Sequence, residues 1–550
     1  MRPREVVRAT YSRSPRDRGG GPKSCLSVAP CVRARGTRPA ERPCVLVRIR
    51  SGAVLGVQAI PVDVEVESTV GMPGFHLVGL ATGAVQEAKV RVAAAVRNLG
   101  VTLPQKRITV NLAPADLRKD GTGFDLPMAI GVLAAAEEIP AEAVAQVHFV
   151  GELALSGELK AGRGVLPLAI EARRAAARAI VVPEANALEA SIVEGVRVLS
   201  ARHLGDVVAW ARGAASLRPP LGIAPPPPEG VPIDLADVTG QENAKRALEI
   251  AAAGAHNLLF FGPPGSGKTM LARRLPTLLP PLAFEEALEA TVVHSVAGLT
   301  RHRGLLTTRP FRAPHHSISD AGLVGGTSVP RPGEVSLAHH GVLFLDELPE
   351  FRRHVLEALR QPLEDGEVTI ARAGRSVTYP AEVTLVAAMN PCPCGYHGDR
   401  RRRCRCTAHE LLAYRRRISG PLLDRIDLHV DVPSLAAPLL GEPPSAAATS
   451  AEVRARVERA REVQRARAGG RGSGVNARLR GGTLRKVATP DEGGRRILQG
   501  AVEKLGLSAR AHDKVLRVAR TIADLEGSDA VRALHVAEAV QYRGLDRPIF

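Results

Sequence analysis

The feature that most constrains the fold of this chain is the glycine-rich segment 262–269, which reads GPPGSGKT. The apolar run 257–261 precedes it, and residues 270–275 have the composition of a starting helix. In such a strand–loop–helix unit, glycines let backbone N–H groups turn toward phosphate oxygens, and the helix dipole adds to the attraction. The expected ATP-binding residues are Gly262, Pro263, Pro264, Gly265, Ser266, Gly267, Lys268 and Thr269. Lys268 should reach the β- and γ-phosphates, and the Thr269 hydroxyl should bind Mg²⁺.

Two further apolar runs end in polar side chains that suit a phosphate site. Residues 341–345 lead into Asp346 and Glu347, and residues 383–389 lead into Asn390. Buried strands can deliver such groups at their carboxyl ends. We expect Asp346 to complete the Mg²⁺ shell, Glu347 to polarise the attacking water, and Asn390 to position that water or sense the γ-phosphate. The alternatives are a solvated acidic turn for the first pair and an ordinary strand-end turn for Asn390.

Residues 420–427 read GPLLDRID and place Arg425 among acids. An arginine of this kind can act in trans and stabilise transition-state charge in a neighbouring subunit. The alternative is a local salt bridge to Asp424 or Asp427.

Composition divides the 550 residues into five segments, because a chain of this length exceeds one hydrophobic core. A basic extension precedes a mixed α/β segment, a proline-rich linker, the segment with the phosphate site and a mostly helical C-terminal segment. The expected ranges are 1–44, 45–213, 214–231, 232–433 and 434–550.

Local patterns support these segments. Val62, Val64 and Val66 alternate with acids, which predicts a half-buried strand, and apolar residues at helical spacing between 85 and 96 predict a helix. Thr449 and Glu452 form the pattern of a capping box at the start of a charged helix.

The net charge of +18 is unevenly distributed. Residues 1–50 carry 13 Lys and Arg against 3 Asp and Glu, a net +10, which leaves +8 for the rest. Total charge is therefore weak evidence for a nucleic-acid partner. No apolar run approaches the roughly 20 residues of a membrane span, and the extension lacks a signal-peptide core, so we expect a cytoplasmic protein with no membrane contact. A disordered extension, an over-long start and a transit peptide are the alternatives for residues 1–44.

Four of the seven cysteines form a C-x-C…C-x-C set: Cys392, Cys394, Cys404 and Cys406. Four thiolates can complete a tetrahedral Zn²⁺ shell. Because the spacing within each pair is tighter than the common C-x₂-C, reduced or redox-active thiols are the alternative.

Longer strings carry a resemblance to a known family. They are RSGAVLGVQAIPVDVEV (50–66), RITVNLAPADLRKDGTGFDLP (107–127), DVTGQENAKRALEIAAAGAHNLLFFGPPGSGKTMLARRLP (237–276), RPFRAPHHSISDAGLVGG (309–326), MNPCPCGYHGD (389–399), SGPLLDRIDLHV (419–430) and SARAHDKVLRVARTIADLEG (508–527). Together they resemble the magnesium-chelatase-like branch of the AAA+ ATPases and, more closely, the YifB/ComM family, over roughly residues 45–550.

The resemblance implies an α/β fold, an AAA+ P-loop core with a C-terminal helical lid, preceded by a separate mixed α/β Lon-protease-like domain. It identifies Asn390 as sensor 1, Arg425 as the arginine finger and Arg510 as the sensor-2 arginine. The implied activity is Mg²⁺-dependent ATP hydrolysis by a homo-oligomeric ring, expected to be a hexamer. The ring would act on single-stranded or branched DNA without sequence preference, as a branch-migration helicase in recombination and natural transformation, with recombination proteins as partners.

The Lon-like segment lacks the protease machinery that the resemblance would require. The nucleophilic serine should stand where this chain has Gly123, and the lysine base where it has Ala172. Without a nucleophile and a base, covalent catalysis cannot take place. We therefore expect a non-proteolytic scaffold or DNA-handling module.

Residues 367–371 and 376–379 are two β-type runs across a glycine-containing turn, which predicts a hairpin. Its turn carries Arg372 and Arg375, and in related ring helicases a hairpin here contacts the DNA backbone. These arginines are the DNA-contact candidates, with a solvated surface hairpin as the alternative. For His315 and His316 we expect structural or DNA-facing roles.

Two other functions stay open beside the DNA motor. One is a magnesium-chelatase-type ATPase that acts on a porphyrin-bound complex. The other is a chaperone-like ATPase that remodels a protein.

Overall fold

The computed structural model describes most of the chain after the basic extension. The described residues are 45–80, 83–102, 106–119, 121, 123–219, 233–300, 302–326, 330–372, 375–399, 401–434, 448–469 and 474–546. The predicted extension 1–44 and most of the predicted linker 214–231 lie outside them, so these two predictions stay untested.

A seven-stranded mixed sheet organises residues 45–218. Its strands, in sheet order, are β3 (Gly74–Val78), β4 (Arg107–Ala113), β2 (Gln58–Thr69), β1 (Val45–Leu55), β5 (Val147–Phe149), β8 (Ala179–Pro183) and β9 (Arg197–Ala201). The β1–β2 and β2–β4 pairs are antiparallel, whereas β1, β5, β8 and β9 run parallel to one another. The predicted valine alternation lies in β2, where every second side chain is buried.

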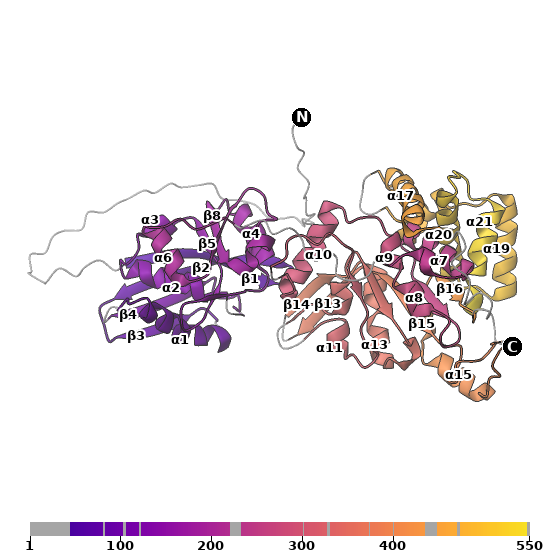
Figure 1. Cartoon of the computed structure of the whole chain (residues 1–550), viewed down its shortest axis with the longest axis horizontal. Coiled ribbons are helices and arrows are strands. Elements are labelled where there is room, and N and C mark those ends of the chain that lie inside the picture. Colours follow the sequence, from indigo (N-terminus) through magenta and orange to yellow (C-terminus); the bar gives the residue numbers. More distant parts are fainter. Residues whose placement is uncertain are drawn as a thin grey trace, which may run out of the picture. The chain divides into compact units, whose positions relative to one another are not determined.

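Six helices and a short ribbon accompany this sheet (Figure 1). They are α1 (Gly83–Asn98), α2 (Asp125–Ala135), α3 (Ala141–Val144), α4 (Val165–Arg174), α5 (Ala187–Ala190), α6 (Leu204–Ala211), and the strands β6 (Glu152–Leu153) and β7 (Leu159–Lys160). Helix α1 covers the predicted apolar helix, and Gly100 follows it with a φ of 78°, a conformation that glycine adopts without strain. Every residue of α2 is buried, so this helix forms the centre of the core.

A second sheet of five parallel strands organises residues 233–434. In sheet order these strands are β11 (Phe311–Arg312), β12 (Val342–Leu345), β15 (Thr384–Met389), β10 (Leu258–Phe261) and β16 (Leu428–Asp431). Strand β15 lies between the strand that precedes segment 262–269 and the strand that ends in the acid pair. This mixed α/β arrangement with a parallel sheet is consistent with the predicted AAA+ core.

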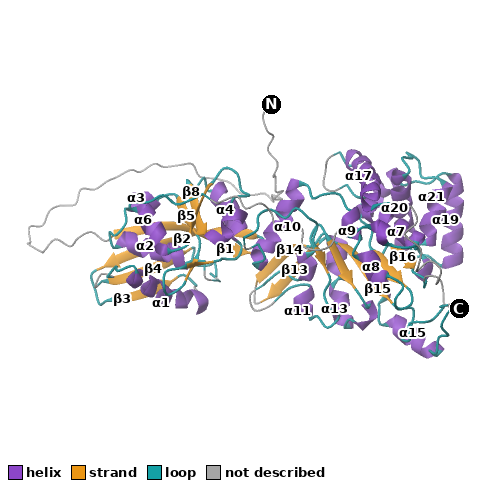
Figure 2. Ribbon diagram, viewed as in Figure 1, coloured by secondary structure: helices purple, strands orange, loops and turns teal. Residues whose placement is uncertain are grey.

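Helices cover the five-stranded sheet (Figure 2). They are α7 (Glu242–Gly254), α8 (Lys268–Ala272), α9 (Leu275–Leu278), α10 (Phe284–Ala297), α11 (Asp320–Leu323), α12 (Glu334–Leu337), α13 (Arg353–Ala358), α14 (Arg360–Asp365), α15 (Ala408–Arg416) and α16 (Gly420–Leu423). Alternate strand residues enter two separate cores: Leu258 and Phe260 pack with α7, whereas Leu259 packs with α13 and the hairpin. This two-sided burial explains why the strands read as continuous apolar runs.

The C-terminal part is helical, as predicted. It contains α17 (Ser450–Arg467), α18 (Gly481–Val487), α19 (Glu492–Leu505), α20 (Ala509–Leu525) and α21 (Ala533–Gln541), and α17 and α20 pack on α7. Thr449 caps α17, and Glu452 completes the predicted capping box. Short 3₁₀ turns occupy Glu184–Asn186, Leu235–Asp237, Leu348–Glu350, Asn476–Arg478 and Gly544–Asp546.

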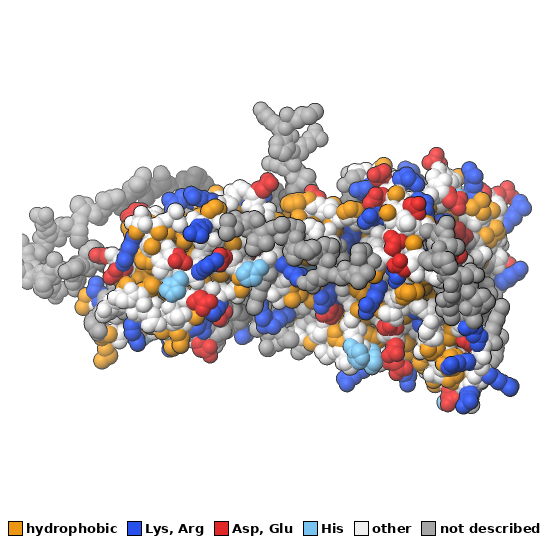
Figure 3. Space-filling model, viewed as in Figure 1, with side chains coloured by type: hydrophobic (Ala, Val, Ile, Leu, Met, Phe, Trp, Pro, Cys, Tyr) orange, Lys and Arg blue, Asp and Glu red, His pale blue; other side chains and the backbone are white. Residues whose placement is uncertain are grey.

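On the face drawn in Figure 3, Lys and Arg side chains of the described residues are interspersed with Asp and Glu. This mixing agrees with the small net charge of the chain beyond residue 50. Among the described residues, none of the helices is long and apolar enough to span a bilayer.

Candidate functional site

Segment 262–269 forms the loop between β10 and α8 that the sequence predicts. Gly265 and Gly267 have φ values of 77° and 92°, which side chains with a Cβ rarely adopt. A Cβ on Gly262 would stand 2.1 Å from the carbonyl oxygen of Val432, so only glycine fits there. Local sterics therefore set the path of this loop.

Lys268 lies at the amino end of α8, within the loop. Its Nζ donates to the carbonyl oxygens of Gly262 at 2.7 Å and Pro263 at 2.8 Å, and to the side-chain oxygen of Asn390 at 3.3 Å. Burial lowers the pKa of Lys268, and the nearby Asp346 carboxylate opposes that shift. The ammonium group is thus held at the loop by polar atoms that a phosphate could replace.

Thr269 and Asp346 meet as predicted. The Thr269 hydroxyl donates to Asp346 Oδ2 at 2.7 Å. Hydroxyl and carboxylate oxygens are the hard ligands that Mg²⁺ prefers, and α8 and the end of β12 present one of each at the same point. The residues therefore fit a Mg²⁺ ion bridging protein and phosphate.

Glu347 follows Asp346 in a strained backbone conformation with a φ of 51°. Its carboxylate is more than half exposed and lies 3.5 Å from Nδ1 of His316. The ring of His316 stacks on His315 and contacts the edge of Phe351. Sequence reasoning did not connect His316 with Glu347, because about thirty residues separate them and only the fold brings the ring to the acid. The adjacent histidines were the only signal.

A second charged region occupies the opposite edge of the same sheet. A cavity of about 700 Å³ is lined there by residues at the amino ends of the strands, including Asn257, Gly341 and Thr384. Its basic residues are Arg309, Arg425, Arg461, Arg478, Arg480, Arg510, Lys514 and Arg517. Since the six residues of β15 span about 20 Å, this cavity and the glycine-rich loop lie on opposite edges.

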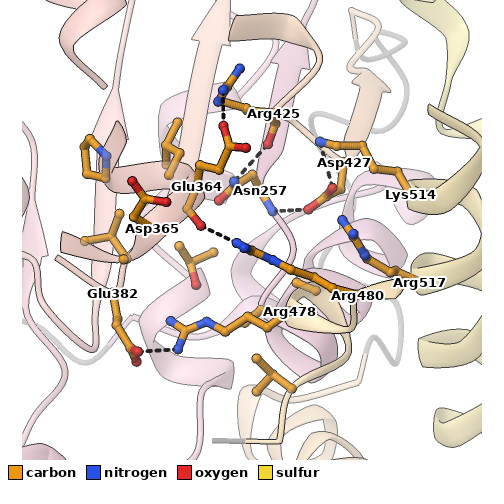
Figure 4. Close-up of a pocket in the computed structure, with 18 of the residues that line it drawn as sticks. Asn257, Glu364, Asp365, Glu382, Arg425, Asp427, Arg478, Arg480, Lys514 and Arg517 are labelled. Atoms are coloured by element: carbon orange, nitrogen blue, oxygen red, sulfur yellow. Dashed lines mark hydrogen bonds and ion pairs between the residues drawn. The ribbon is translucent and has the colours of Figure 1, made fainter. Parts of the chain in front are cut away.

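Arg425 is one of the predicted residues in this cavity. Its guanidinium group pairs with Glu364 and donates to the carbonyl oxygens of Pro421 at 2.7 Å and Arg360 at 3.2 Å (Figure 4). The alternative of a local salt bridge to Asp424 or Asp427 is therefore wrong, because the acid that Arg425 contacts comes from α14, about sixty residues earlier. Arg425 lowers the pKa of Glu364 chiefly through the hydrogen bond between the two side chains.

Asp427 has a different partner from the one expected. Lys514 on α20 lies 2.9 Å from its Oδ1, and the backbone N–H of Asn257 donates to its Oδ2 at 3.1 Å. Asp427 and Lys514 are both buried. The charge of Lys514 holds the pKa of Asp427 far below its usual range, against the effect of burial. This pair joins the residue before β16 to helix α20 of the C-terminal part.

Arg510 lies in the first turn of α20 and is exposed. It lines the same cavity as Arg425 rather than the glycine-rich loop. Arg480 and Arg478, which sequence reasoning missed, also point into this cavity: Arg480 donates to the carbonyl oxygen of Glu364, and Arg478 pairs with Glu382 at 2.5 Å (Figure 4). Their only sequence signal was the local density of arginine.

The predicted hairpin is present as β13 (Glu367–Arg372) and β14 (Arg375–Pro380), with Arg372 opposite Arg375. One face is buried through Val368, Ile370, Val377 and Tyr379, and the other is exposed. The turn residues 373–374 and the side chains of the two arginines lie outside the described part of the structure. Their contact with DNA stays a prediction.

The four cysteines converge. Sγ of Cys392 lies 3.3 Å from that of Cys394 and 3.8 Å from that of Cys404, and Cys394 lies 3.6 Å from Cys404. All four sulfurs lie within 4.8 Å of one another. Backbone N–H groups of Arg405 and Tyr396 lower the pKa of Cys394.

Positions 123 and 172 contain no protease chemistry in the structure. Gly123 lies in the turn before α2, and Ala172 is buried on α4. Asp125, next to this turn, is buried and held by Arg91 at 2.6 and 2.9 Å and by the N–H of Leu153 at 3.1 Å. This carboxylate has a packing role, and the Lon-like character of the segment stays a prediction.

The chain is similar to several known proteins. Three profiles match: "Magnesium chelatase, subunit ChlI" over residues 234–439, "Subunit ChlI of Mg-chelatase" over 64–186, and "Magnesium chelatase, subunit ChlI C-terminal" over 447–543. The competence protein ComM of Haemophilus influenzae is 46% identical over 508 residues, which cover 91% of this chain and 98% of the relative.

The uncharacterized protein YifB of Escherichia coli is 45% identical over 504 residues, 91% of this chain and 97% of that protein. This chain belongs to the YifB/ComM family. The magnesium-chelatase 38 kDa subunit of Rhodobacter capsulatus is similar over a smaller part, 30% identical over 174 residues, or 28% of this chain and 49% of the subunit. Membership of this magnesium-chelatase-like AAA+ family implies the use of ATP and Mg²⁺.

Proposed function

We propose that this chain is the subunit of a ring-shaped ATPase that moves DNA strands, a branch-migration motor in recombination or natural transformation. The observation that carries the ATPase part is the 2.7 Å contact between Thr269 and Asp346, with Lys268 and Asn390 beside it. Two adjacent strand ends and one helix start thus supply a lysine, two Mg²⁺ ligands and an amide at one point.

In this proposal each residue has one task. Mg²⁺, held by Thr269 and Asp346, would neutralise charge on the transferred phosphate. Lys268 would bind the β- and γ-phosphates, and Glu347 would accept the proton of the attacking water. His316, at 3.5 Å, would orient the Glu347 carboxylate. Asn390 would position that water or sense the γ-phosphate.

The positions of Arg425 and Arg510 are the reason for proposing a ring. Both line the cavity at the sheet edge opposite the glycine-rich loop, so neither reaches the phosphates of its own chain. If they stabilise transition-state charge, they do so at the site of a neighbouring subunit. A closed homo-oligomer brings the loop of one chain to the arginine cavity of the next, and six subunits is the number we propose.

The proposed action on DNA is based on the β13–β14 hairpin and on the name of one relative. The hairpin is anchored by its buried face, so its turn with Arg372 and Arg375 has a firm base from which to contact a phosphate backbone. Such contacts give affinity without sequence preference. The relative from Haemophilus influenzae has the name competence protein, and a role in the handling of incoming DNA is consistent with that name. Such a role places the protein in the cytoplasm.

One set of assays tests the proposal. ATP hydrolysis should rise with single-stranded or branched DNA, and the protein should move a three-stranded junction in an ATP-dependent way. Lys268→Ala should abolish turnover. Arg372→Ala/Arg375→Ala should lose DNA stimulation, whereas the matched pair Arg459→Ala/Arg465→Ala, on exposed positions of α17, should retain it. Stimulation by a porphyrin or by an unfolded protein, and none by DNA, would replace the DNA motor with one of the two other functions.

A further inference from the structure

The segment between Asn390 and α15 has no regular secondary structure at its described positions. Residues 391–407 contain no helix or strand among the described positions, and the few buried ones include Cys392 and Gly395. A segment of this length without regular structure buries too little apolar surface to pay for its own ordering. Hydrogen bonds of Asp399 and Tyr396 hold part of it, and small folds commonly add a metal ion for the same purpose.

The sulfur positions fit a single tetrahedral ion. Four sulfurs at about 2.3 Å from one Zn²⁺ lie about 3.8 Å apart. The three separations among Cys392, Cys394 and Cys404 are 3.3, 3.6 and 3.8 Å, and Cys406 lies within 4.8 Å of each of them. A disulfide would need a sulfur separation near 2.05 Å, so the observed arrangement does not correspond to one. Four sulfur ligands in this geometry suit zinc better than the oxygen-preferring Mg²⁺.

Backbone donors lie around the sulfurs and oppose the effect of burial, which raises the pKa of the Cys392 thiol. The N–H of His397 donates to Sγ of Cys392 at 3.3 Å, and the N–H of Cys406 donates to Sγ of Cys404 at 3.4 Å. The guanidinium group of Arg415, on α15, lies close enough for its charge to act on Cys392. Each of these groups stabilises negative sulfur and offsets the excess negative charge of four thiolates around one divalent ion.

The first cysteine pair lies directly against the phosphate loop. Gly395 follows Cys394 with a φ of 85°, and a Cβ there would stand 2.6 Å from Cδ of Pro264. Asn390, two residues before Cys392, accepts a hydrogen bond from Lys268. The position of the cysteine segment therefore decides where both of these loop contacts are made.

We propose that Cys392, Cys394, Cys404 and Cys406 bind one Zn²⁺, and that this centre holds Gly395 against Pro264 so that the phosphate loop and Asn390 keep their positions. The zinc site stands on the sulfur geometry alone. Its effect on the loop rests on the proposed nucleotide site.

Metal analysis of the full chain, purified under reducing conditions, tests the site. The wild-type chain should contain about one Zn²⁺, and Cys404→Ser or Cys406→Ser should contain less than about a tenth of that. Cys44→Ser removes a thiol from outside the cluster and should retain the metal. Cobalt exchanged into the wild-type protein should show the visible bands of tetrahedral thiolate coordination.

A wild-type chain that contains no zinc and has four freely reactive thiols in the cluster would overturn the proposal, as would iron in place of zinc. Because a serine variant can fail to fold, the wild-type chain is tested as well. A thiol-modifying mercurial should release its zinc in proportion to the cysteines that react.

Nucleotide binding tests the proposed effect of the zinc centre on the phosphate loop. Removal of zinc from the wild-type chain should weaken the affinity for a fluorescent ATP analogue by about tenfold, and added Zn²⁺ should restore it. Unchanged affinity after complete removal would overturn the effect on the loop. Lys268→Ala should lose nucleotide binding and keep its zinc. A wild-type chain that holds zinc but binds no ATP would refute the proposed function and leave the zinc site intact.

Discussion

The two edges of the five-stranded sheet differ in how their charged groups are held. At the carboxyl edge, Lys268, Thr269 and Asp346 come from segments next to a strand end and contact one another within one small site. At the amino edge, Arg425 and Lys514 pair with carboxylates from distant segments, and Arg480 donates to the carbonyl oxygen of Glu364. The first edge presents the predicted phosphate loop, and the second presents an arginine-rich cavity. This separation is the basis of the proposal that the phosphate loop of one subunit meets the arginine-rich surface of a neighbour.

Replacement of Arg425 is the strongest test of this comparison. Arg425→Ala should lower the rate of ATP hydrolysis by about 10³- to 10⁵-fold, because an arginine finger supplies that much transition-state stabilisation. ATP binding should be retained, since the phosphate loop is unchanged. Steady-state hydrolysis and equilibrium binding of a nucleotide analogue measure the two effects.

A mixture of two inactive variants tests whether Arg425 acts at the ATP site of a neighbouring subunit or at that of its own chain. Lys268→Ala and Arg425→Ala each leave one half of the site intact. Mixed in equal amounts before assembly, they should recover activity, because about a quarter of the interfaces then have both wild-type halves. Activity that stays at the level of the separate variants would contradict the action of Arg425 across the interface.

The buried ion pair at the amino edge should matter for stability rather than for catalysis. Asp427→Ala should lower the free energy of unfolding by about 3–5 kcal/mol, because Lys514 is left buried with its charge uncompensated. Denaturant unfolding measures the loss, with the half-buried neighbour Asp424→Ala as the matched control. Equal effects of the two substitutions would show that Lys514 finds another partner.

The seven-stranded sheet contains a buried histidine that should make folding sensitive to acid. His148 in β5 is buried, and burial lowers its pKa to about 4. The unfolded chain therefore binds a proton below about pH 6.5 that the folded chain does not. Stability should fall as pH drops through that window, by about 2 kcal/mol between pH 6.5 and pH 5.

His148→Gln should remove this part of the pH dependence. Thermal unfolding of both proteins at several pH values is the measurement. A variant with the same slope as the wild-type protein would assign the acid sensitivity to another group.

Replacement of Glu364 should have the smallest effect on stability and on ATP turnover. Its carboxylate is about half exposed, so its pair with Arg425 should contribute less than about 1 kcal/mol to stability. Glu364→Gln should therefore change unfolding little and change ATP turnover by less than about fivefold. A turnover loss close to that of Arg425→Ala would instead make Glu364 essential for the position of Arg425.

Much of the phosphate edge was predictable because its signals are local. Gly262 to Thr269 form a loop whose sterics depend on near neighbours, and Asp346 follows an apolar strand directly. The amino edge was less predictable. The alternative for Arg425 was a salt bridge to the acids beside it in sequence, but helix α14 brings Glu364 to it from elsewhere. Asp427 likewise pairs with Lys514, which helix α20 brings from a distant part of the chain.

The cysteine cluster was predictable in part from local sequence and depends in part on the fold. Their number and spacing identified a candidate metal set, but the spacing within each pair left reactive thiols as an alternative. The folded chain brings the sulfurs of both pairs within 4.8 Å of one another and places Gly395 against Pro264, neither of which a linear pattern contains. His316 likewise came to Glu347 only through the fold.

The sequence by itself determined the phosphate loop, the strands that flank it, the acid pair, the capped helix at Thr449 and the family. These depend on backbone sterics and on periodic burial, which act over a few residues. Only the tertiary structure decided which acid holds Arg425, where Arg510 lies relative to the loop, and how closely the four sulfurs meet. Those outcomes depend on distances between segments far apart in the chain, and packing of strands and helices sets such distances.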